Sequence, residues 1–228
     1  MKLQPQPVRD SKQKVPKHPA STGPSTIKAS VKIGNGKAAP SPLKGGDSAS
    51  IVGVLTPLLT DKSLLRKMAR KSTDDGAVTP DYSLDKETVI GLLNESLATE
   101  LVCTLRYKRH YYVASGIKGR FVAKEFAQHA IEELAHADLI AERIMQLGGT
   151  PDFNPVGLAD RSHAEYFAGT DLHDMVRENL VAERIAIESY RAFIQYLGDK
   201  DPTTRSMLES ILAMEEEHAD DLMDLLKD

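Results

Sequence analysis

The sequence has one cysteine, Cys103, no tryptophan and no long apolar run. A single cysteine excludes an intrachain disulfide and any metal site built from four cysteines. The start, MKLQPQPVRDSKQKVPKHP, lacks the apolar core of a signal peptide. The stretch IVGVLTPLL at 51–59 is interrupted by Pro57 and is far shorter than the roughly 20 residues that span a bilayer. These features predict a cytoplasmic protein with no membrane segment.

Acidic residues are scarce at one end of the chain. Residues 1–50 hold nine Lys or Arg against Asp10 and Asp47, together with seven prolines, seven serines and five glycines. The net charge of this segment is +7. Because the net charge of the whole chain is −4, the remaining residues carry a net charge of −11. A segment of this composition cannot bury enough apolar surface to offset the conformational entropy that its chain would lose on folding. We therefore predict a disordered basic tail over 1–50, a short helix and linker over 51–82, and a folded domain over 83–228.

The folded part shows helical periodicity in four segments. The first helix is predicted to begin after Ser83 or Asp85 and to end at Gly116, and the others to cover about 120–147, 171–197 and 202 onward. GIKG at 116–119 is predicted as a short link, whereas the connection over about 150–170 is long. Short, long and short connections predict an all-α, antiparallel four-helix bundle with a crossover between its second and third helices.

One short motif occurs twice. Glu133 and His136 stand three residues apart in EELAHADLIAERI, and Glu215 and His218 repeat this spacing in MEEEHADDLMDLL. On a helix, an i,i+3 spacing puts both side chains on one face. Glu133, Glu215 and His218 fall within the apolar stripes of their helices, and His136 shares the face of Glu133, so all four side chains are predicted to face the core.

A glutamate precedes each copy of the motif by a matched distance. Glu100 lies 33 positions before the first motif glutamate and Glu183 lies 32 positions before the second. Each is followed seven residues later by a tyrosine, Tyr107 or Tyr190. The chain therefore contains two copies of one helical hairpin.

Four carboxylates and two imidazoles on inward faces would destabilise the fold if nothing compensated them. A pair of divalent cations is the economical solution, since one Glu from each of two helices and Glu-x-x-His from the other two is the ligand set of carboxylate-bridged dimetal bundles. The structural alternative is a salt-bridged cluster that uses Arg143 or Arg184. A single Glu-x-x-His is usually a solvated face, but two copies with matched glutamates favour the metal site.

Residues from about 84 to 228 resemble the ferritin-like superfamily, and within it bacterioferritin and its Dps-like relatives. The resemblance rests on NESLATELVCTLRYKRHYY, IEELAHADLIAERIMQLGGTPDF and MLESILAMEEEHADDL. It implies two iron ions per subunit, with manganese as the other candidate, and Tyr107 beside the centre. The implied ligands are Glu100 and Glu183 as terminal carboxylates, Glu133 and Glu215 as bridging carboxylates, and His136 and His218 as nitrogen donors.

The sequence departs from this family at several positions. Leu134 stands where bacterioferritin has its haem-ligating methionine, so no haem is expected. Gln128 replaces the histidine of the family's inner-surface iron site, and only Glu132 supplies the acid. The thiol pair of some Dps-like relatives cannot form with Cys103 alone. Ten residues follow His218, too few for the fifth helix of the twenty-four-subunit shells, which favours a dodecamer.

The resemblance implies a ferroxidase that stores or detoxifies iron, oxidising ferrous ions with dioxygen or hydrogen peroxide. One alternative is a di-manganese, catalase-like peroxide scavenger on the same bundle. A second is a Dps-like protective protein that binds DNA without sequence preference through residues 1–50, whose lysines suit phosphate contacts.

Several other polar residues have weaker signals. Asp138 and Asp220 are candidates to orient the two motif histidines, or else exposed helix charges. The remaining histidines of the folded part have no matched partner, and surface or capping roles are expected for them: His110, His129, His163 and His173.

Overall fold

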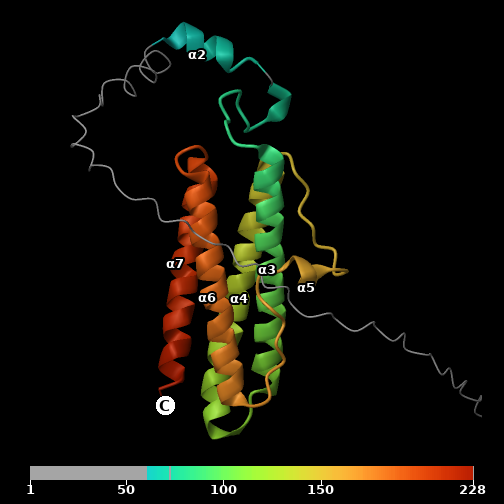
Figure 1. The fold of residues 1–228 in the computed structure, drawn as a ribbon, viewed down its shortest axis with the longest axis vertical. Helices are drawn as coiled ribbons and strands as arrows, with labels where there is room; N and C mark the ends of the chain where they lie inside the picture. The colour runs from blue at the N-terminus through green and yellow to red at the C-terminus, as the bar shows by residue number, and fades with distance from the viewer. Residues whose placement is uncertain (1–60, 72, 228) are drawn as a thin grey trace, which may run out of the picture. The chain divides into compact units, whose positions relative to one another are not determined.

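The computed structural model describes residues 61–71 and 73–227 (Figure 1). The tail predicted over 1–50 lies outside these residues. The described part contains helices and no strand, which confirms the all-α prediction. A short helix, α2 (Lys62–Met68), and a 3-10 turn, η1 (Thr73–Asp75), come first. The helices that follow are α3 (Lys86–Val113), α4 (Gly116–Gln146), the one-turn α5 (Leu158–Arg161), α6 (Leu172–Leu197) and α7 (Pro202–Leu225).

Aspartates cap three of the four long helices. The Asp85 side chain accepts a hydrogen bond from the Thr88 amide at 3.1 Å, and Asp171 and Asp201 accept equivalent bonds at the start of α6 and α7. Each carboxylate satisfies an amide that the first helical turn leaves unpaired. Pro202 occupies the first position of α7, where its missing N–H costs no helical bond.

The predicted link at 116–119 is wrong. Helix α4 already begins at Gly116, so the turn between α3 and α4 consists of Ala114 and Ser115 alone. Gly116 takes a φ of +85°, which an L side chain rarely adopts, and a Cβ on Gly119 would lie 3.2 Å from the Ala114 carbonyl carbon. The two glycines therefore permit a tight reversal, whereas the sequence pattern indicated a loop.

The long helices form two hairpins, α3 with α4 and α6 with α7. Helix α3 also contacts α6, and α4 contacts α7, which closes a four-helix bundle (Figure 1). The crossover from α4 to α6 contains α5, which packs against α3 and was not expected from the sequence. Of the described helices, α3 alone is apolar and long enough to cross a membrane, and 56% of that apolar stretch is buried inside the bundle.

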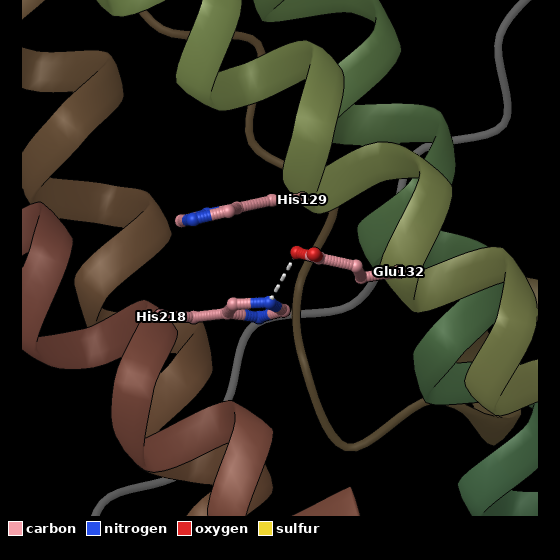
Figure 2. Close-up of side chains that lie close together, drawn as sticks. All are labelled: His129, Glu132 and His218. Atoms are coloured by element: carbon pink, nitrogen blue, oxygen red, sulfur yellow. Dashed lines mark hydrogen bonds and ion pairs between the residues drawn. The ribbon is translucent and has the colours of Figure 1, made fainter.

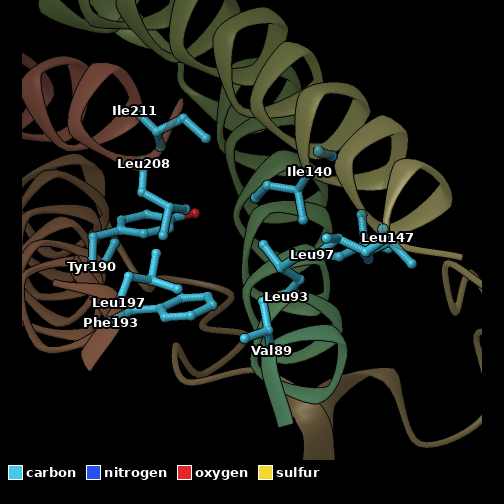
Figure 3. Packing of buried hydrophobic residues seen from close by; sticks show 13 residues of the cluster. Val89, Leu93, Leu97, Ile140, Leu147, Tyr190, Phe193, Leu197, Leu208 and Ile211 are labelled. Atoms are coloured by element: carbon cyan, nitrogen blue, oxygen red, sulfur yellow. The ribbon is translucent and has the colours of Figure 1, made fainter. Parts of the chain in front are cut away.

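The apolar core has two parts along the bundle. The larger cluster includes Leu93 and Leu97 of α3 and packs them against α4, α6 and α7 (Figure 3). The smaller cluster includes Tyr107 and Phe126. On each of the four helices the predicted ligands come between the residues of the larger cluster and those of the smaller one. Apolar packing on both sides therefore keeps water from the polar layer and fixes its backbone.

Candidate metal centre

The six side chains of the predicted ligand set converge in the polar layer of the bundle. Helix α3 supplies one glutamate, α6 another, and α4 and α7 each supply a glutamate and a histidine. All six residues are at most 5% exposed. They are Glu100, Glu133, His136, Glu183, Glu215 and His218.

The six residues divide into two overlapping groups of four. The first contains Glu100 and His136, the second contains Glu183 and His218, and both contain Glu133 and Glu215. In each group, one ligand atom per residue lies within 4.8 Å of all the others. Two ions could therefore sit side by side and share two carboxylates.

Distances show how the shared glutamates divide their oxygens. His136 Nδ1 lies 3.9 Å from Glu133 Oε2 and 3.0 Å from Glu215 Oε1. His218 Nδ1 lies 3.6 Å from Glu133 Oε1 and 3.7 Å from Glu215 Oε2. Each shared carboxylate thus turns one oxygen toward each histidine, which is the arrangement of a bridging ligand.

Every one of the six side chains has a buried polar atom without a hydrogen bond. These atoms include both oxygens of Glu215 and Nδ1 of both histidines. The terminal glutamates, Glu100 and Glu183, each leave Oε2 unpaired. A buried unpaired polar group costs about 1–3 kcal/mol, and more when charged. So many unpaired oxygen and nitrogen atoms in one place fit a site that binds cations, because coordination to the ions satisfies all of these atoms together.

Two tyrosines hold the terminal glutamates in a reciprocal pattern. Tyr107 of α3 donates its hydroxyl to Glu183 of α6, while Tyr190 of α6 donates to Glu100 of α3. Both bonds take Oε1 and leave Oε2 directed at the centre. Each hairpin therefore orients the terminal ligand of the other hairpin.

The metal-free centre holds protons tightly. Burial, and then the neighbouring Glu133 carboxylate, raises the pKa of Glu100 to about 8. Burial alone would lower the pKa of both histidines. The surrounding carboxylates outweigh that effect and raise the pKa of His136 to about 12 and that of His218 to about 11. The imidazoles thus carry charge when no ion is bound, and an ion must displace their protons.

An acid outside the centre orients one histidine. His218 Nε2 lies 2.9 Å from Glu132 Oε2, so the ring can direct Nδ1 into the centre (Figure 2). Asp138 and Asp220, the predicted candidates for this role, are exposed, and among the described residues neither bonds to His136 or His218. Glu132 lies 86 positions from the histidine it contacts, a pairing that helical spacing cannot reveal.

The salt-bridged alternative does not describe this cluster. Arg143 pairs with Asp201 near the end of the bundle, and Arg184 is exposed. Two histidines expected at the surface are also buried. His110 bonds to Asn179 and to the Phe167 carbonyl, which fastens the crossover to α3. The second is His129, four residues before Glu133 on the same face of α4, and this spacing could have predicted its burial.

Comparison with known proteins agrees with this architecture. The model of the ferritin-like domain matches residues 90–228. The chain belongs to the ferritin-like domain family. This confirms the resemblance found in the sequence.

Individual relatives within the ferritin-like family add detail. Bacterioferritin BfrA of Mycobacterium tuberculosis is 30% identical over 137 residues, which cover 58% of this chain and 79% of the relative. A dodecameric thioferritin, the bacterioferritin-related protein from Bacteroides fragilis, is 36% identical with a TM-score of 0.62, covering 64% of this chain and 88% of that one. A ferritin-like, diiron-carboxylate protein from Bacillus anthracis is 28% identical with a TM-score of 0.56, covering 63% and 99%.

Proposed function

We propose that this ferritin-like domain is a ferroxidase that stores or detoxifies iron. The observation that carries the proposal is the pair of four-ligand groups that share Glu133 and Glu215. Two ferrous ions held together can each give one electron to hydrogen peroxide, which with two protons becomes two water molecules. Dioxygen can accept the same two electrons and two protons to become hydrogen peroxide.

The donor set suits iron in both oxidation states. Carboxylates bind hard cations and imidazoles suit iron, whereas the centre contains no thiolate. Four carboxylates carry the charge that two divalent cations cancel, so a loaded centre leaves little net charge in the core. The diiron-carboxylate relative from Bacillus anthracis supports iron, and manganese is the alternative metal.

The residues of the chain have separate roles in this mechanism. Tyr107 and Tyr190 hold the terminal carboxylates in place, and Glu132 holds the ring of His218. The apolar clusters on both sides limit the access of water.

The assembly proposed for the chain is a hollow shell, with a dodecamer favoured over a 24-mer. The dodecameric relative from Bacteroides fragilis supports this choice. Several large apolar side chains also remain on the surface of the single chain, including Ile117, Phe121 and Ile131, which are 98%, 67% and 63% exposed. Subunit contacts would cover such groups. The mass of the native particle tests the proposal directly.

Oxidation of ferrous iron by the purified protein tests the function. Metal-free protein given about two ferrous ions per subunit should consume dioxygen or peroxide and yield ferric iron, and Glu215→Ala should abolish this reaction because both groups lose a ligand. Glu216→Gln, an exposed neighbour on α7, is the matched control. Destruction of peroxide with manganese bound and without iron oxidation would favour the catalase-like alternative instead.

A further inference from the structure

The side chain of His129 has no role in the dinuclear centre and yet is almost completely buried. The residue is 1% exposed, and among the described residues its ring makes no hydrogen bond. Its Nδ1 is a buried atom without a partner. Nε2, which faces two carboxylates, is therefore the ring atom that can bind a ligand.

The ring of His129 lies against two residues of the centre. It stacks on His218 with ring centroids 4.1 Å apart and an interplanar angle of 22° (Figure 2). It also meets Tyr107 edge-on, with centroids 5.2 Å apart and planes at 90°. These contacts fix the ring and leave Nε2 directed at two carboxylates, those of Glu125 and Asp221.

The two carboxylates lie at distances that suit a shared ion better than a hydrogen bond. His129 Nε2 is 3.7 Å from Glu125 Oε1 and 3.8 Å from Asp221 Oδ2. A hydrogen bond would need about 2.7–3.2 Å. Ligands at about 2.1 Å from a tetrahedral ion lie roughly 3.4 Å apart. A small closure of the three groups would therefore complete a ligand set.

A second grouping around the same ring is less suited to an ion. It combines His129 with Glu132 and His218. Both oxygens of Glu132 already have partners, because Oε1 accepts from Gln128 at 2.6 Å and Oε2 faces His218 Nε2 at 2.9 Å. Glu125 and Asp221 contact His129 instead and remain available.

We propose that Glu125, His129 and Asp221 form a third divalent-cation site, separate from the dinuclear centre. The side chains of Asp221 and Glu125 are 49% and 33% exposed, whereas that of His129 is 2% exposed. The three groups thus lead from solvent to the ring that stacks on His218. This site loads ferrous iron for the centre, a role that rests on the proposed function, whereas the cation site itself does not.

Titration of the metal-free full chain with Zn²⁺ tests the site. Calorimetry should find about three ions per subunit in the unmodified protein, and about two in Glu125→Gln/Asp221→Asn, with the two tighter ions unchanged. Glu216→Gln/Asp220→Asn removes the same charge from exposed acids and should keep all three. His129→Phe keeps a flat ring in the stack and should also lose one ion. Equal stoichiometry in all four proteins overturns the proposal.

The loading role has its own measurement. At low ferrous iron, Glu125→Gln/Asp221→Asn should oxidise iron about tenfold more slowly than the control, and excess iron should restore the rate. An unchanged rate at low iron overturns the loading role. Loss of the third Zn²⁺ in a protein that never oxidises iron would instead reject the ferroxidase function and keep the cation site.

Discussion

Arg143 near the end of α4 donates to both carboxylate oxygens of Asp201, the residue that caps α7, at 3.0 and 3.1 Å. The same guanidinium donates from Nε to Thr204 Oγ1 at 2.7 Å, and the Tyr82 hydroxyl reaches Asp201 Oδ2 at 3.0 Å. Asp201 is 3% exposed. One buried carboxylate therefore joins the first hairpin, the segment before α3 and the start of the last helix.

Removal of this carboxylate should destabilise the bundle strongly. Asp201→Ala leaves the buried Arg143 charge without a counter-charge and removes the cap, so the free energy of unfolding should fall by about 3–5 kcal/mol. Asp199→Asn is the control, because Asp199 pairs with Arg205 while fully exposed and such pairs contribute little. Denaturant unfolding of the metal-free proteins measures both. Equal losses in the two variants would contradict the buried network.

The same network predicts how stability responds to acid. Burial alone would raise the pKa of Asp201, but hydrogen bonds from Thr204 and the charge of Arg143 lower it below its usual value. A lowered folded-state pKa gives stabilisation that is present above the unfolded pKa of about 3.9 and is lost as pH falls through the folded value. The stability difference between the unmodified protein and Asp201→Ala should therefore shrink below about pH 4. A difference that grows in acid would refute this.

The reciprocal tyrosine bonds predict two separable defects. Tyr190→Phe releases Glu100 and should weaken the ion beside His136, whereas Tyr107→Phe releases Glu183 and should weaken the ion beside His218. Loss of such an orienting bond should reduce affinity about 10–100-fold. Co²⁺ titrations followed by visible absorption distinguish the two ions. Identical spectra and affinities in both variants would show that the tyrosines do not hold the ligands.

Ion binding should release protons and should weaken as pH falls. With pKa values of about 12 and 11, His136 and His218 are protonated in the metal-free protein at neutral pH, and each must lose its proton to ligate. Affinity should therefore rise at least tenfold per pH unit for each ion between about pH 6 and 8, and more steeply for the ion beside His136, because Glu100, with a pKa of about 8, releases a second proton there. Proton release in weakly buffered solution gives the count. Affinities that do not change over this range would mean that neither the histidines nor Glu100 hold a proton in the metal-free protein.

The charge of residues 1–50 predicts salt-sensitive binding to DNA. In gel shifts, the full chain should slow the migration of duplex DNA at low salt and should release the DNA at moderate salt. Residues 51–228, with a net charge of −11, should not bind DNA. A full-length variant with its nine tail Lys and Arg residues replaced by Gln is the matched control. Equal retardation by the full and shortened chains would exclude the tail from this role.

The fold was predictable because each helix carries its own signals. Apolar stripes with a period near 3.6 residues placed the buried faces, and Asp85 and Pro202 marked helix starts that the structure confirms. The turn before α4 was not predictable, because glycines such as those at 116 and 119 occur in the first turn of a helix as well as in loops. The four-residue α5 lacks enough residues to show a period.

The candidate centre was predictable where its residues repeat along one helix face. Glu133 and His136 lie in line with Ile140 and Ile144, so their burial follows from the stripe. The contacts that orient them join residues far apart in sequence, such as Tyr190 with Glu100, and depend on how the hairpins dock. Helical spacing carries no information about that docking.

The reciprocal tyrosine–glutamate hydrogen bonds between α3 and α6 provide a way to measure correct folding. A detached hairpin would hold one terminal glutamate without its tyrosine, three ligands of one group and one ligand of the other, so neither four-ligand group would be complete. The amount of metal that stays with the protein through dialysis therefore counts the molecules whose two halves have joined correctly, and it can serve as an assay of maturation.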